Sequence, residues 1–329
     1  MKKILCCLLL MMSMLLVACK KEEAEKTFLE ILTEAKSYKV EGVMESFYQE
    51  GRKQNNFTVY FKDPLLKVVT SSTEDENKQI ILKNNDGVYI LIPSVNKNFK
   101  IQSGWPNNAS YPYLLQSLAK DIANEENPII TEDETTKTIE TETFMHKNAV
   151  ATKQKIILDK ETCLPTEVLI FDAHGDLFIR VVFTNVELDY NVSDDEFIVE
   201  KSMTTARTDA TTSVEYQREV DYPTYFPTGC ILTGETTASS TDGTEVRSIM
   251  KYSGDVGFTL IQEFVYDQET TVYQQEVGEV VFVLGTAAIL KDSGVHTIYQ
   301  GVEYTVASNN LSIDEMIKIV SSYMMNETK

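Results

Sequence analysis

The sequence predicts a mainly β (α+β) fold, in which a long antiparallel meander of strands, covered by apolar helices, is followed by a smaller α+β domain. Apolar and polar residues alternate in many successive segments, which is the pattern of half-buried strands. Turn signals such as Asp63-Pro64 and His174-Gly175-Asp176 separate these segments. A few segments instead repeat their apolar residues at helical spacing, and these helices need an apolar surface to cover.

The chain begins with the pattern of an export signal. Two lysines precede the apolar run Ile4–Ala18, which is shorter than the roughly 20 residues of a membrane-spanning helix. The run ends in the sequence LVAC at Cys19, which resembles a bacterial lipobox. That resemblance implies cleavage before Cys19 and attachment of a diacylglycerol to its thiol. We therefore expect a lipoprotein signal peptide at 1–18 and a tether at 19–22, with an uncleaved signal anchor or a buried cysteine as the alternatives. Two or three acyl chains would hold the protein firmly on the outer face of the cell membrane.

The composition limits the classes of partner. The formal net charge of −20 becomes −22 (28 basic minus 50 acidic residues) once Lys2 and Lys3 are removed with the signal. Nucleic-acid binding requires a basic surface, so nucleic acid is not an expected partner. Anionic lipid headgroups are excluded by the same argument, and any lipid ligand must be held by apolar contacts. Residues 19–329 are long for a single core and predict two domains.

The first predicted domain, 23–200, begins with an amphipathic helix at about 23–36. Strand patterns follow from Tyr38 onward, with Val88, Ile90 and Ile92 as one example of the alternation. A second helix at about 111–124 interrupts the strands, and its apolar face must cover the sheet. The face of that helix consists of Leu114, Leu115, Leu118 and Ile122.

A Thr- and Ser-rich stretch at 201–215 predicts a linker, and 216–329 a second domain. This domain contains strand-like runs at 245–252, 257–266, 279–284 and 295–307, and it ends in a helix whose Ser312 and Glu315 fit a capping box. Ile313, Met316, Ile317, Val320 and Met324 are expected to form the buried stripe of this helix. Cys163 and Cys230 fall in different predicted domains, so we expect them not to form a disulfide with each other.

Several motifs resemble the LolA/LolB/RseB-like lipoprotein-carrier superfamily. They are YFKDPLLKVV, NNDGVYILIPSVNKNFKI, LDKETCLPTEVLIFDAHGD and SDDEFIV, within residues 23–200. The second domain resembles the RseB-like C-terminal domain of two-domain Gram-positive lipoproteins related to sporulation and germination, most specifically at YTVASNNLSIDEM. The resemblance implies a curved antiparallel half-barrel, LolA-like, with helices that plug its concave side.

In that superfamily the concave face binds lipid or acyl chains, or another protein. The residues expected to line such a ligand cavity are Tyr38, Val40, Met44, Phe57, Val59, Phe61, Ile90, Leu114, Leu118 and Ile122. The other interpretation of these residues, ordinary core packing, remains open from the sequence.

The sequence carries little that indicates catalysis. The three histidines are scattered, and H-E-x-x-H, C-x-x-C and G-x-S-x-G are absent. We therefore expect a non-enzymatic protein with no metal and no cofactor. The leading hypothesis is a membrane-anchored binding or regulatory module that acts in sporulation or germination through a protein partner. One alternative is a lipid or lipoprotein carrier or receptor with an acyl-chain ligand in the half-barrel. Another is an RseB-like envelope-stress sensor that binds an anti-sigma factor.

Overall fold

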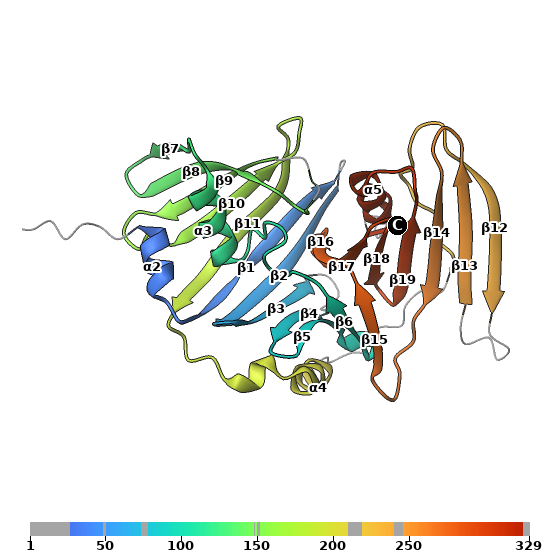
Figure 1. Ribbon diagram of the computed structural model, residues 1–329, viewed down its shortest axis with the longest axis horizontal. Coiled ribbons are helices and arrows are strands. Elements are labelled where there is room, and N and C mark those ends of the chain that lie inside the picture. The colour runs from blue at the N-terminus through green and yellow to red at the C-terminus, as the bar shows by residue number, and fades with distance from the viewer. Residues whose placement is uncertain are drawn as a thin grey trace, which may run out of the picture.

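The computed structural model describes residues 27–48, 51–73, 78–147, 149, 152–209, 219–239 and 246–324. The fold is mainly β, as predicted. Figure 1 shows a large curved sheet at one end of the long axis and a smaller sheet at the other end. The first sheet has 12 strands and the second has seven. Below, residues 27–209 are called the N-terminal part and residues 219–324 the C-terminal part.

The N-terminal part opens with a helix and then forms almost all of the large sheet. Its elements are α2 (Phe28–Glu34), β1 (Ser37–Tyr48), β2 (Gly51–Lys62), β3 (Leu65–Ser72), β4 (Lys78–Asn84), β5 (Gly87–Ile92), β6 (Lys97–Gln102), α3 (Leu115–Asn124), β7 (Ile129–Glu132), β8 (Thr136–Thr143), β9 (Thr152–Asp159), β10 (Pro165–Phe171), β11 (Leu177–Leu188) and α4 (Val199–Asp209), with short 3₁₀ turns at Pro93–Val95 and Asp194–Phe197. The described part of the helix expected at 23–36 starts at the N-cap residue Thr27, whose hydroxyl and backbone form a capping box with Glu30.

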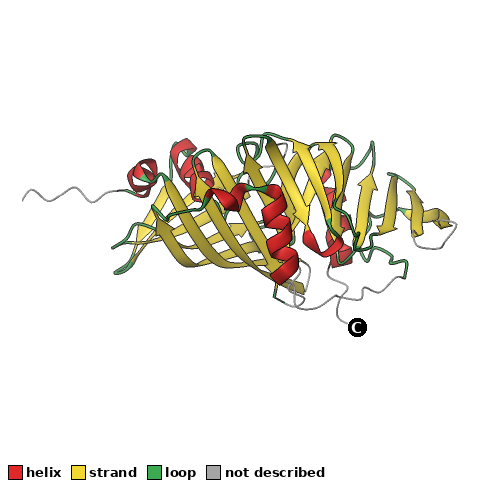
Figure 2. Ribbon diagram, turned by 90° about the horizontal axis from the view of Figure 1, so that it is seen from below, coloured by secondary structure: helices red, strands yellow, loops and turns green. Residues whose placement is uncertain are grey.

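The large sheet has the order β15-β6-β5-β4-β3-β2-β1-β11-β10-β9-β8-β7. Its neighbours in the N-terminal part are antiparallel, and β1 pairs with β11 to join two meanders into one curved surface. Helices α2 and α3 lie over the concave side of this surface (Figure 2). The curvature and the two covering helices agree with the half-barrel that the resemblance implied.

The predicted linker at 201–215 is wrong for its first part. Residues up to Asp209 continue helix α4, and the positions from 210 to 215 lie outside the described residues. Met203 and Ala206, three residues apart, are buried on the convex side of the sheet against Leu82 and Leu91. Strands β4 and β5 are apolar on both faces, so their outer face needs a cover. The sequence did not predict this helix, because threonines surround Met203 and only two apolar residues, Met203 and Ala206, are buried in the contact.

The C-terminal part consists of β12 (Ile231–Ser239), β13 (Val246–Ser253), β14 (Phe258–Phe264), β15 (Val272–Val277), β16 (Glu279–Val283), β17 (Thr286–Lys291), β18 (Gly294–Tyr299), β19 (Val302–Ala307) and α5 (Ile313–Met324). The smaller sheet has the order β12-β13-β14-β19-β18-β17-β16. Strand β15 leaves it and pairs in parallel with β6, at the edge of the large sheet. The two parts therefore share a sheet as well as an interface.

The C-terminal helix is found where it was predicted. The Glu315 backbone N–H donates to Ser312 Oγ at 3.2 Å, as an N-cap requires. Met316, Val320 and Met324 of the predicted stripe are buried, while Ile313 and Ile317 are partly buried against the same core. Cys163 and Cys230 do not form a disulfide, as predicted.

Candidate binding site

The concave face of the large sheet is lined with the residues expected there, and they belong to one packed core. Eight of the ten predicted cavity residues are at most 2% exposed: Tyr38, Val40, Met44, Phe57, Val59, Ile90, Leu114 and Leu118. The other two, Phe61 and Ile122, are partly buried against the same cluster. The sheet and the helices supply both sides of each contact, so these side chains fill the concavity with one another.

Tyr38 shows how the helices close on the sheet. Its ring stacks on Phe61 with 4.8 Å between the centroids, and its hydroxyl donates to the side chain of Gln116 on α3. Burial raises the pKa of Tyr38 well above its ordinary value, against the smaller effect of the Gln116 hydrogen bond. The hydroxyl therefore stays protonated and holds α3 to β1.

Phe57 occupies the space above β1 where a side chain at position 42 would stand. A Cβ at Gly42 would lie 2.5 Å from the Phe57 ring and 2.3 Å from the Val182 carbonyl oxygen. On its other sides the Phe57 ring contacts Phe183 and Tyr113, at centroid distances of 6.0 and 5.9 Å. Gly42 thus makes room for the Phe57 ring, which packs at the centre of the concave face.

Residues of the C-terminal part also pack on the concave face of the large sheet. The Tyr113 ring packs against Phe282 at 5.0 Å, and the Tyr111 hydroxyl donates to the Val280 carbonyl oxygen at 2.7 Å. Ala287, Ile289 and Ile298 also belong to the core cluster of the large sheet. Two segments far apart in the sequence therefore share one hydrophobic core, which no feature of either segment predicts alone.

A tight turn of the C-terminal part presses on the large sheet nearby. Leu284 and Gly285 have φ values of 50° and 83°, and a Cβ at Gly285 would lie 1.9 Å from Asn55 Nδ2. Asn55 Nδ2 donates to the Leu284 carbonyl oxygen at 3.1 Å. Gln79 accepts from the Ala287 backbone N–H at 2.7 Å and donates to the Ile298 carbonyl oxygen at 2.9 Å. Polar side chains of β2 and β4 thus bind backbone groups of the C-terminal part at fixed positions.

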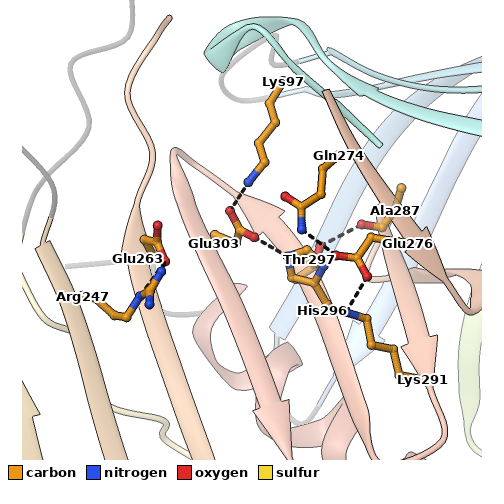
Figure 3. Close-up of polar contacts among 10 residues, drawn as sticks. All are labelled: Lys97, Arg247, Glu263, Gln274, Glu276, Ala287, Lys291, His296, Thr297 and Glu303. Atoms are coloured by element: carbon orange, nitrogen blue, oxygen red, sulfur yellow. Dashed lines mark hydrogen bonds and ion pairs between the residues drawn. The ribbon is translucent and has the colours of Figure 1, made fainter. Parts of the chain in front are cut away.

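A buried group of charged residues, here called the polar joint, also connects the two parts (Figure 3). Glu303 on β19 accepts from Lys97 Nζ of β6 at 2.5 Å and lies 2.6 Å from His296 Nε2 of β18. On the neighbouring β15, Glu276 accepts from Lys291 Nζ at 2.7 Å and from Gln274 Nε2 at 2.6 Å. Four strands of the C-terminal part and one strand of the N-terminal part contribute to the joint.

The electrostatics of Glu303 indicate a structural role for the polar joint. Burial opposes ionisation of Glu303, but its hydrogen bonds and charge interactions with His296 and Lys97 outweigh burial and lower its pKa to about 2. A carboxylate that is paired with two donors is an anchor for them. A second such contact joins His146 Nε2 to Asp314 Oδ1 of α5 at 3.0 Å, and this contact lowers the pKa of Asp314.

The sequence analysis missed the polar joint. His296 and Glu303 lie on either side of the tight turn at Gln300-Gly301, where Ile298 pairs with Glu303, so His296 and Glu303 are diagonal neighbours on one face of a hairpin. Recognition of that hairpin would have placed the two side chains together. Lys97 could not have been found in the same way, because it comes from about 200 residues earlier in the chain.

The described residues lack the features of a metal site and of a membrane-spanning helix. They contain no group of three or more His, Cys, Asp or Glu side chains that could hold a metal ion. Among the helices the structure describes, none combines the length and the hydrophobicity that a membrane crossing requires. Cys19, the predicted lipidation site, lies outside the described residues.

Among the described strands, two edge strands are exposed at every residue, unlike β15 and β16 at the other edges of the two sheets. Strand β12 ends the small sheet and β7 ends the large one, and all residues of both are exposed. They lie at opposite ends of the molecule (Figure 1). Ile231 on β12 and Ile129 on β7 are 65% and 57% exposed. Exposed edges with large apolar side chains are the surfaces on which a partner strand can pair.

Comparison with known proteins gives a family match and one similar bacterial protein. A model of the family described as "Sporulation protein YdcC-like" matches residues 1–197. The sporulation protein YdcC of Bacillus subtilis (strain 168) is 32% identical over 277 residues, which cover 83% of this chain and 81% of that protein.

Two solved structures show weaker similarity. The complex of Pseudomonas aeruginosa MucA and MucB matches with a TM-score of 0.31 and 13% identity, over 90% of this chain and 96% of that chain. An outer membrane lipoprotein-sorting protein domain from Vibrio parahaemolyticus matches with a TM-score of 0.32 and 14% identity, over 53% of this chain and 97% of that chain. The family match covers more than half of the residues, and the Bacillus relative aligns with most of the rest, so this chain belongs to the sporulation protein YdcC-like family.

Proposed function

We propose that this chain is a lipid-anchored, non-enzymatic binding module on the outer face of the cell membrane, which acts in sporulation by holding a protein partner. One observation carries the proposal: the concave face of the large sheet, where a carrier would hold its cargo, is filled by α2, α3 and the C-terminal part. Binding then falls to the outer surface, where strand edges and grooves are exposed.

The sporulation role is supported by the family and by the relative in Bacillus subtilis. The anchor is supported by the lipobox-like sequence that ends at Cys19. A permanent anchor suits a module that works at one membrane and does not suit a shuttle, which must leave the membrane with its cargo.

The anchor is tested by the substitution Cys19→Ala. Only the thiol of Cys19 can take the diacylglycerol, so the variant should no longer be labelled by palmitate and should leave the membrane fraction. Cys163→Ala is the matched control, because it removes a thiol from the described body and should leave labelling and fractionation unchanged. If Cys19→Ala stays labelled and membrane-bound, the anchor is not at Cys19.

The carrier alternative is tested by titrating the full-length chain with a fluorescent fatty acid. If the concave face is filled, the chain should show no saturable binding of the probe. The fluorescence should then match that of a control that contains detergent micelles and no protein. Saturable uptake of one probe per chain, with slower hydrogen exchange in α3, would instead support a carrier or receptor of acyl chains and would contradict the proposal.

A further inference from the structure

The geometry points to a binding site for an extended, basic segment of a protein partner along the edge of the large sheet at β7 and the end of β8. This inference rests on the proposed function and names the surface and the chemistry of the partner. We call this surface the stepped edge and define it by residues 129–132 of β7 and 141–143 of β8.

The step arises because β7 is shorter than β8. Residues Ile129–Glu132 pair with Lys137–Glu140, while β8 continues to Thr143. Over 141–143, β8 has no strand beside it on that side among the described residues. The backbone N–H of Glu142 donates there to a side chain, Glu125 Oε2, at 3.1 Å. A carboxylate on an exposed loop thus occupies the position where the carbonyl oxygen of an added strand would lie.

Apolar side chains mark the same edge. Ile129 and Ile130 are 57% and 49% exposed, and they point to opposite faces of the sheet because they are successive residues of a strand. Phe144, directly after β8, is 43% exposed. Strand β7 is short and follows Pro128 directly, which limits the edge, but its own residues Ile129, Ile130, Thr131 and Glu132 include no lysine and no proline. A strand added beside β7 would cover apolar surface on both faces.

A groove continues from the step. It has a volume of about 570 Å³ and runs between the end of α3, the loop at 108–110 and the end of β8. Its charged lining consists of Asp121, Glu125, Glu126 and Glu142, against Lys120 and Lys147. Asp121 is buried and bonded to Ser110 and Gln154, so the exposed charge of the groove comes from the three glutamates and two lysines.

The chain around the step is acidic beyond the average of the protein. Residues 120–134 contain six carboxylates and one lysine. Asp121 is buried and Glu132 pairs with Lys137 and Lys160, so Glu125, Glu126, Asp133 and Glu134 are the carboxylates left without a lysine partner among the ion pairs of the described residues. Strand β12, the exposed edge of the small sheet, has one acidic residue in nine, Glu235, and that carboxylate accepts from the Tyr222 hydroxyl. Charge therefore distinguishes the two edges, and complementarity at the stepped edge requires lysine or arginine in the partner.

These features together describe strand addition. The main chain of the partner would pair with β7 and replace Glu125 as the acceptor at the Glu142 N–H. Side chains on one face of the added strand would cover Ile129, those on the other face would cover Ile130, and basic side chains would meet Glu126 and Glu142. Backbone pairing supplies affinity in such complexes, and the alternate side chains supply specificity.

The experiment uses the full-length chain and two short synthetic peptides, one of alternating lysine and valine and one of alternating glutamate and valine. The lysine peptide should bind, and hydrogen exchange should slow at the backbone amides of β7 and at Glu142. Binding should weaken as salt is added. The glutamate peptide should not bind.

Two variants locate the site. Ile130→Lys and the double variant Glu126→Lys with Glu142→Lys should each weaken the lysine peptide about tenfold or more, as the loss of a central contact does at an interface. Their controls make changes of the same kind elsewhere: Ile231→Lys on β12, and Glu269→Lys on an exposed loop, should bind as the wild type does. All five positions are on the surface, so folding should be kept.

Three results would overturn the inference: no binding of the lysine peptide, exchange protection away from the stepped edge, or equal losses in the variants and their controls. None of these results would contradict the proposed function. The proposed function fails only if acyl chains occupy the concave face or if no protein partner binds anywhere on the outer surface.

Discussion

At the scale of single residues, Lys97 is the cation that the N-terminal part contributes to the polar joint. Its removal in Lys97→Met leaves Glu303 buried with His296 alone. Breaking a buried ion pair by removal of one partner typically costs about 3–5 kcal/mol, so the free energy of unfolding should fall by roughly 3 kcal/mol in a urea titration.

Lys201→Met is the control for Lys97→Met. Lys201 pairs with Asp195 at 2.6 Å on the exposed surface, and such pairs contribute about 1 kcal/mol or less. Equal losses in the two variants would show that the polar joint contributes no more than a surface ion pair.

The pKa of Glu303 gives a pH dependence to stability. Its folded pKa of about 2 lies below the ordinary value of 4.5, so its contribution is fully present above pH 4.5 and is lost as the pH falls from 4.5 toward 2. Glu303→Gln should therefore be less stable than the wild type at neutral pH, and its stability should fall less steeply below pH 4.5. Urea titrations across this window measure both slopes, and parallel slopes would contradict the assignment.

At the scale of elements, helix α3 closes the concave face. Leu118 is fully buried between α3 and the sheet, so Leu118→Glu places a carboxylate in the core. We expect a loss of about 2–5 kcal/mol and a lower melting temperature. Ala123→Glu, on the exposed side of the same helix, should melt close to the wild type. A stable Leu118→Glu variant with altered uptake of a fatty-acid probe would mean that α3 is a lid over a cavity.

The elements that the sequence predicted are those with a clear period. Alternation located several strands of the large sheet, and the capping residues located the start of α5. Strands β12 and β15 were not predicted, because most of their side chains are exposed on both faces of the sheet. Strand β17 was not predicted, because nearly all of its side chains are buried. None of the three strands alternates between buried and exposed residues clearly enough to be recognised. Helix α4 escaped because its buried face is only a few residues wide.

The sequence predicted which residues share the concave face, and it left open whether they line a ligand cavity or form packed core. Alternation showed that Tyr38, Val40 and Phe57 face one side of the sheet, and they do form its concave face. Whether that face is open or filled depends on Val280, Ile289 and Ile298, which lie more than 200 residues from Tyr38 in the chain. Contacts of this range depend on the tertiary fold, and local patterns carry no information about them.

At the scale of the molecule, the two parts are joined by a shared core, a shared sheet and the polar joint. A protease recognition sequence inserted between 210 and 218 would allow the chain to be cut between them. The two fragments should co-elute in size-exclusion chromatography without denaturant, since the cut removes none of these contacts. Fragments that separate at once would show that the interface is weaker than the shared core implies.

The central claim is that this protein binds through its outer surface and that its concave face is filled. Photo-cross-linking in sporulating cells tests it most directly, with a photoreactive residue at Phe61 or Ile122 on the concave face, or at surface positions that include Ile130 and Ile231. The account predicts a discrete protein adduct from at least one surface position and no lipid adduct from positions 61 and 122. Lipid adducts from positions 61 and 122, without a protein adduct from any surface position, would contradict it.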